Sequence, residues 1–198
     1  MSTSTQKTAT ATLDIAKTAV SDLASQLAKM AQAQADSMLK GIGNELADKA
    51  KALCQSTSGN SNLQAKVDSS MQALMAGNDS SALATLFQTV KEASLTPQQV
   101  QLVKEFGNLT SAYVVQRNFS SLDGMQGDVA TIVSSLRKGE VTPAIPSIQK
   151  VAQNANLTVS QKELIGSLTE RYAPGLKGAA STLQQGFQTL QGLKGVGK

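Results

Sequence analysis

The sequence nearly repeats itself. The stretch SLTPQQVQL begins at Ser94, and 62 positions later the similar stretch NLTVSQKEL begins at Asn156. In the first, Thr96 has Gln99 three positions on; in the second, Thr158 has Gln161. A threonine hydroxyl can accept a hydrogen bond from the backbone N–H three residues later, while the glutamine side chain reaches back to the threonine N–H. This arrangement is the capping box, so both stretches predict the start of a helix.

The similarity extends on both sides of the two caps. No gap is needed between positions 74 and 106, and apolar residues recur at the same offset together with a glycine. We interpret this pattern as an internal duplication of a helical unit of about sixty residues. The matched pairs include Leu74 with Leu136, Gly77 with Gly139, Ala82 with Ala144, Ala93 with Ala155, Leu102 with Leu164, Val103 with Ile165, and Phe106 with Leu168.

The composition favours helices over a sheet. Aromatic residues make up only 3% of the 198 residues, and tryptophan is absent, so the core must be built from Leu, Val, Ile, Met and Ala. Alternating runs of β-branched residues, which would indicate strands, are also absent. We therefore predict an all-α fold: a long N-terminal helical arm, two tandem (duplicated) three-helix units, and a C-terminal helix.

The predicted domain organisation follows from the loops. Residues 1–10 are rich in serine and threonine and are expected to be a disordered tail. The loop STSGNSN separates an N-terminal helical arm, 11–55, from a duplicated domain, 60–198. That domain divides into unit one, 60–122, and unit two, 126–198. The predicted helices are 63–76, 81–93 and 97–118 in unit one, and 128–138, 143–154 and 159–172 in unit two, followed by a last helix over 175–193.

The N-terminal arm carries a narrow apolar seam. Its apolar residues are spaced by three and four positions, which is typical of a coiled-coil-like helix. We expect a helix over 10–40 with a break at Gly41 and Gly43, because glycine weakens a helix interior. The seam predicts either packing within the chain or pairing with a second copy. Its candidate interaction residues are Leu13, Val20, Leu23, Leu27 and Met30.

The net charge of +4 is unevenly distributed. Residues 1–125 carry ten basic and ten acidic side chains, whereas 126–198 carry eight basic and four acidic ones, and no acid follows Glu170. A basic end can favour an anionic surface; it can equally be a solvated helix end whose cations oppose the helix dipole. The candidate contacts for an anionic surface are Arg171, Lys177, Lys194 and Lys198.

No motif for catalysis, metal binding or cofactor binding is present. The chain has no histidine, which removes the commonest general base and metal ligand. It also lacks glycine-rich phosphate-binding motifs and calcium-binding loops. The single cysteine, Cys54, is expected to be a small buried apolar residue. We therefore predict no enzyme, no cofactor and no metal. We also expect a cytoplasmic protein, since neither a secretory signal nor a membrane-spanning run is evident.

These observations favour a non-catalytic helical interaction or scaffold protein that acts through protein–protein contacts or self-association. The alternative is a surface-associated protein that binds lipid or granules, because the size and the aromatic-poor composition resemble those of the granule-associated phasins. An enzyme that works without histidine chemistry is the third hypothesis. The few aromatic residues near basic ones give no specific signature of nucleic-acid binding.

Overall fold

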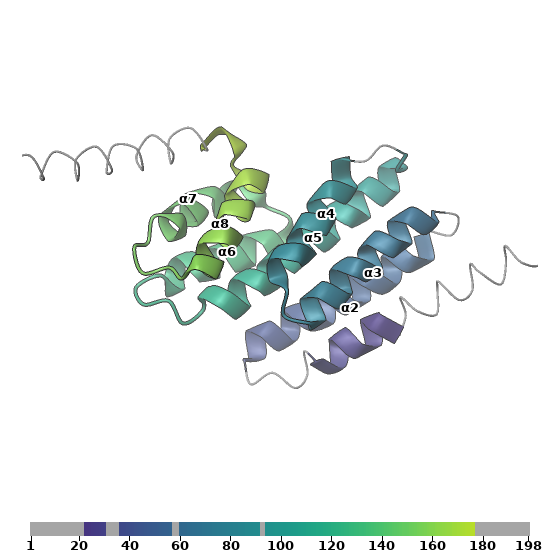
Figure 1. Ribbon diagram of the computed structural model, residues 1–198, viewed down its shortest axis with the longest axis horizontal. Coiled ribbons are helices and arrows are strands. Elements are labelled where there is room, and N and C mark those ends of the chain that lie inside the picture. Colours follow the sequence, from purple (N-terminus) through teal and green to yellow (C-terminus); the bar gives the residue numbers. More distant parts are fainter. Residues whose placement is uncertain (1–21, 31–35, 57–59, 92–93, 177–198) are drawn as a thin grey trace, which may run out of the picture.

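The computed structural model describes residues 22–30, 36–56, 60–91 and 94–176, and within these ranges the chain forms helices and no strand (Figure 1). The all-α prediction is therefore confirmed. Residues 22–30 are helical. The following elements are α2 (Ser37–Ser56), α3 (Ser61–Met75), α4 (Asp79–Lys91), α5 (Pro97–Phe119), α6 (Gln126–Lys138), α7 (Val141–Ala152), α8 (Val159–Tyr172) and the short 3₁₀ turn η1 (Pro174–Leu176).

The helix boundaries agree with the sequence-based ones to within two residues from α3 to α8. Both capping boxes are formed: the Thr96 hydroxyl accepts from the Gln99 N–H at 3.2 Å, and the Thr158 hydroxyl accepts from the Gln161 N–H at 3.2 Å. In each box the glutamine side-chain oxygen accepts in return from the threonine N–H. These two predictions of helix starts and caps are confirmed.

The turns that end α3 and α6 also have the same geometry. Gly77 and Gly139 both have left-handed backbones, with φ of 77° and 75°. After α3, the Asn78 N–H donates to the Ala73 carbonyl; after α6, the Glu140 N–H donates to the Ser135 carbonyl. This closure of the last turn by a bond five residues back satisfies carbonyls that a helix end leaves open. The next helices then begin 62 residues apart, at Asp79 and Val141.

The prediction for the N-terminal arm was wrong in one respect. α2 begins at Ser37 and runs through Gly41 and Gly43 without the predicted break. Its start is set by Asp36, whose carboxylate accepts from the N–H groups of Met38 and Leu39 at 2.8 and 3.2 Å. Two glycines cost a helix only about 1 kcal/mol each, and the burial of one side of α2 offsets that cost.

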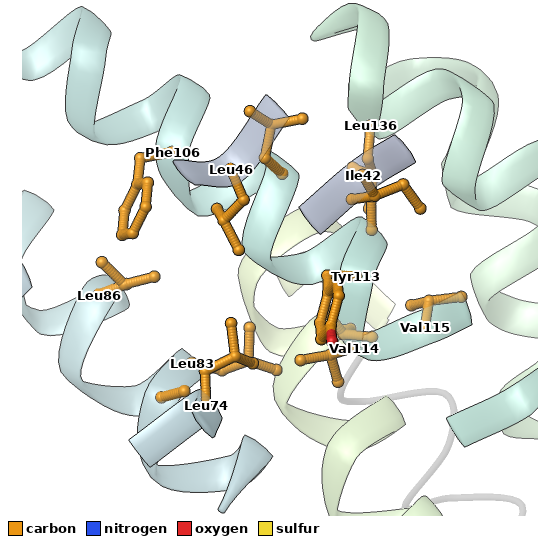
Figure 2. Close-up of a cluster of buried hydrophobic side chains, with 14 of the residues drawn as sticks. Ile42, Leu46, Leu74, Leu83, Leu86, Phe106, Tyr113, Val114, Val115 and Leu136 are labelled. Carbon is orange, nitrogen blue, oxygen red and sulfur yellow. The ribbon is translucent and has the colours of Figure 1, made fainter. Parts of the chain in front are cut away.

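The helices pack around α5. Within the described part of the chain, α2, α4 and α6 all lie against it, α3 lies against α4, and α7 connects α6 to α8. Figure 2 shows labelled side chains from these elements meeting around Phe106 and Tyr113 of α5, with Ile42 and Leu46 from α2 and Leu86 from α4. One continuous cluster of buried apolar residues extends from Ala24 to Tyr172. From Phe106 to Phe119 no residue of α5 is exposed, so this part of α5 is the centre of the arrangement.

Candidate functional site

The described part of the N-terminal seam packs on the chain's own core. Leu27 is fully buried and belongs to the same apolar cluster as α2 and α5. Leu23 and Met30 are partly buried against that cluster. Leu13 and Val20 lie outside the described residues. Between 22 and 30, therefore, the seam contacts this chain, which corresponds to the first of the two arrangements that its pattern predicts.

Of the four basic residues proposed to contact an anionic surface, only Arg171 lies in the described part. Its guanidinium carbon is 5.3 Å from the centre of the Phe87 ring. The same ring meets Tyr172 edge-on, with the ring centres 6.3 Å apart. Arg171 is thus a partly buried cation stacked on an aromatic face, an interaction of about 0.5–1 kcal/mol. Lys177, Lys194 and Lys198 lie outside the described residues.

Tyr172 joins α8 to α5. Its buried hydroxyl lies 3.0 Å from Asn108 Oδ1 and 3.0 Å from Ser111 Oγ. Burial raises the pKa of Tyr172 to about 12, against a smaller opposing effect of the Ser111 hydrogen bond. These two contacts of the buried phenol fix the end of α8 against α5.

The most buried charge pair in the described chain joins α3, α4 and α5. Asp79 opens α4 and forms an ion pair with Arg117 of α5, whose Nε donates to Asp79 Oδ2 at 3.2 Å. The Asp79 side chain is only 7% exposed and that of Arg117 is 22% exposed. Asn118 also donates to Asp79 Oδ2, at 2.6 Å. Arg117 further donates to the Leu74 carbonyl at the end of α3 and lies 5.1 Å above the centre of the Tyr113 ring.

The two charged side chains of this network are directed at partners within the chain. The Arg117 donors are directed at Asp79 and at a backbone carbonyl, and burial lowers the pKa of the guanidinium. Each partner belongs to a different helix or helix end, so the network holds the turn between α3 and α4 onto α5. Sequence reasoning missed it because an aspartate at a helix start and an arginine 38 residues later carry no joint signal.

Three part-exposed polar contacts hold α2 against α5 and α6. Lys49 Nζ lies 2.5 Å from Glu105 Oε2, and Gln116 donates to Asp36 Oδ2 at 2.8 Å. The hydrogen bond from Lys49, together with a weaker contribution from Gln101, lowers the pKa of Glu105. The hydrogen bond from Gln116 lowers the pKa of Asp36. The third contact is an ion pair between Glu45 and Arg137 of α6.

An open hollow of about 300 Å³ lies beside that third contact. It is lined by Glu45, Ser134, Arg137 and Lys138. Arg137 donates to Glu45 Oε2 at 3.1 Å, and this bonding raises the pKa of the guanidinium. The Ser134 hydroxyl donates to the Thr131 carbonyl of its own helix. Three of the four lining side chains, those of Glu45, Ser134 and Arg137, therefore already have partners, and the hollow holds one acidic and two basic side chains.

Three buried side-chain atoms of the described residues have no hydrogen-bond partner: Gln64 Nε2, Asp68 Oδ1 and the Tyr113 hydroxyl. Gln64 and Asp68 lie one turn apart on α3, and burial raises the pKa of Asp68. Burial likewise raises the pKa of Tyr113. Cys54 is buried, as its sequence context predicts.

Metal-binding groups and membrane-spanning helices are both absent from the described residues. These residues contain no group of three or more Cys, Asp or Glu side chains placed to hold a metal ion. Among them, no helix is both long and apolar enough to span a membrane. No protein family, curated protein or solved structure matches the chain.

Proposed function

We propose that this chain is a non-catalytic helical scaffold that acts through protein–protein contacts, in the cytoplasm. The observation that supports this proposal most directly is the use of its polar side chains. Asp79 and Arg117, Tyr172 and Asn108, and Lys49 and Glu105 each join different helices. These groups fix the helices relative to one another, and a preorganised surface of this kind favours binding to another protein.

The outer surface suits such a role. The exposed positions of α3 and α6 are mostly small or uncharged, among them Ala65, Ser69, Ala130 and Thr131. Val159, at the start of α8, is 74% exposed, and Met38 of α2 is 44% exposed. Methionine is enriched at protein–protein interfaces and charged residues are depleted in their cores, so exposed Met38 supports this role, whereas the alanine and serine positions contribute only their lack of charge.

The test combines partner capture with a control for charge. The full chain is immobilised, proteins from its native host are captured and identified by mass spectrometry, and the purified candidate is titrated against the chain by calorimetry. The matched variant replaces Lys177, Lys194 and Lys198 with serine, which removes basic side chains outside the described helices. The scaffold proposal expects saturable binding that this variant retains.

The surface-binding alternative is tested with the same full chain and its triple serine variant, and it predicts a different result. Far-UV circular dichroism is recorded with and without vesicles that contain an anionic lipid. A scaffold shows a cooperative melt in dilute buffer that vesicles leave unchanged. A gain of helix on vesicles, lost in the triple serine variant and accompanied by no saturable protein partner, would overturn the scaffold proposal in favour of lipid or granule binding.

A further inference from the structure

The two capping glutamines have a second contact that their sequence motif does not predict. Gln99 Nε2 donates to the backbone carbonyl of Ser56, the last residue of α2, at 3.3 Å. Gln161 Nε2 donates to the carbonyl of Asn118, in the last turn of α5, at 2.7 Å. Donor and acceptor are 43 residues apart in both cases. Each glutamine therefore caps its own helix with its oxygen and holds the end of an earlier helix with its nitrogen.

The two contacts close equivalent segments of the chain, each made of two helices, which we call excursions. From the end of α2 the chain runs through α3 and α4 and returns at the start of α5; from the end of α5 it runs through α6 and α7 and returns at the start of α8. Both returns place the start of one helix beside the end of the earlier one. Carbonyls at a helix end have no partner within the helix, so a side-chain donor there satisfies an otherwise open group.

The remaining contacts show how these three helices are oriented. Lys49 meets Glu105, and Asp36 meets Gln116, so α2 and α5 run antiparallel. At the far end of α8, Tyr172 meets Asn108 and Ser111, so α8 runs antiparallel to α5 as well. The first excursion therefore leads into the start of α5, and the second excursion leaves from its end.

We infer that Gln99 and Gln161 act as equivalent joints, each fixing the start of one helix to the end of an earlier one. In this repeated arrangement the antiparallel helices α2, α5 and α8 are connected by two-helix excursions, and one glutamine closes each excursion. The inference does not depend on what the protein binds. It also predicts a difference between the joints. α2 packs along α5, whereas α8 lies mainly against α7 and α4. The Gln161 contact therefore contributes a larger share of the interaction between α8 and α5 than the Gln99 contact contributes to the interaction between α5 and α2.

The substitution Gln161→Glu separates the two roles of the side chain. Glutamate supports a capping box as well as glutamine does, so the cap on Thr158 is kept. A charged carboxylate cannot donate to the Asn118 carbonyl, and it places an oxygen against an oxygen. The control is Ser160→Glu, which adds the same charge at the neighbouring exposed position of the same helix turn. This control accounts for the favourable effect of an acid near a helix N-terminus.

At pH 7 we expect the Gln161→Glu protein to melt about 3–8 °C below the Ser160→Glu protein, from the loss of the donor to one part-buried carbonyl in a chain of this size. Gln99→Glu, against its control Gln98→Glu, should show a smaller difference. At pH 4 and below, a protonated carboxyl regains a donor, so the Gln161→Glu deficit should shrink. Equal melting of Gln161→Glu and its control at pH 7, or a deficit that is unchanged by pH, would overturn the inference.

A distance measurement distinguishes a joint from a mere contributor to stability. Nitroxide labels are placed at exposed Lys104 of α5 and Ala152 of α7 in a Cys54→Ser background, and their separation is measured by pulsed electron resonance below the melting temperature. Gln161→Glu should broaden the distance distribution, because the excursion is no longer closed, while Ser160→Glu should leave it unchanged. Identical distributions in the two proteins would show that Gln161 does not position the excursion.

Discussion

Breaking the Asp79–Arg117 pair provides the sharpest test of how the central helix is held. Arg117→Met removes the guanidinium and keeps much of the side-chain length, leaving Asp79, only 7% exposed, without its cation. A carboxylate at this depth takes up a proton rather than remain charged and unpaired. Protonating an ordinary aspartate at pH 7 costs about 4 kcal/mol, which limits the penalty for leaving this charge unpaired. We therefore expect Arg117→Met to lower the free energy of unfolding by about 3–4 kcal/mol.

The reciprocal variant should cost somewhat less. Asp79→Asn leaves Arg117 charged, but the guanidinium is 22% exposed and still donates to the Leu74 carbonyl. We expect a loss of about 2–3 kcal/mol. Because the double variant leaves no unpaired charge, its loss should be close to that of either single variant, giving a coupling energy of about 2–3 kcal/mol. Arg171→Met is the matched control, since its stacked and partly buried guanidinium should account for no more than about 1 kcal/mol.

Urea unfolding followed by circular dichroism measures these losses through the midpoint, provided that the slope of the transition is unchanged. The pH dependence gives a second check. At pH 7 the Arg117→Met protein carries the whole deficit; near pH 4 the Asp79 carboxyl binds a proton at little cost, so the deficit relative to the parent should shrink. Single losses below about 1 kcal/mol that add in the double variant would refute the reasoning, because they would show that the two charges are not coupled.

Three further predictions follow from individual contacts. Thr96→Ala and Thr158→Ala should each lower the free energy of unfolding by about 0.5–2 kcal/mol in urea melts, because each removes a formed cap; no loss for either would argue against capping. Tyr113→Phe should be neutral or stabilising in the same assay, since its buried hydroxyl has no partner, and a loss above about 1 kcal/mol would reveal one. Deletion of residues 1–56 should abolish cooperative thermal unfolding, because Ile42, Leu46 and Leu53 are buried against the rest of the core; a truncated chain that still melts sharply would show that the remainder folds alone.

The sequence predicts the helices well where a local chemical signal marks their ends. The boundaries of α8 match at both ends, and that of α5 matches at Pro97, because threonine, proline and glutamine at fixed spacing each act on neighbouring backbone groups. Gly139 likewise ends α6 through its own left-handed backbone. For α2 the prediction is wrong, because Gly41 and Gly43 lie inside the helix and its start is capped by the Asp36 carboxylate.

Contacts between distant residues were not predictable in the same way. Nothing in the local sequence marks Arg117 as the partner of Asp79, or Tyr172 as the partner of Asn108. Their pairing depends on how α3, α4 and α8 are laid against α5, and helix packing has no fixed spacing in sequence. The joint formed by Gln161 is an intermediate case: the capping box predicts where its oxygen bonds, but only the arrangement of the helices decides where its nitrogen bonds.

The central position of α5 explains why the two predicted units do not behave as separate bodies in this structure. A helix at the surface shows an apolar side and a polar side, but between Phe106 and Val115 only Asn108 of α5 is less than fully buried. That burial depends on α2 and α4, which precede α5 in the sequence, and on α6, which follows it. Removing either set would expose apolar surface of α5 to water, at about 25 cal/mol for each Å². If the chain arose by duplication of one unit, α5 of the first copy packs against α6 of the second, so the stability of each copy depends on the other.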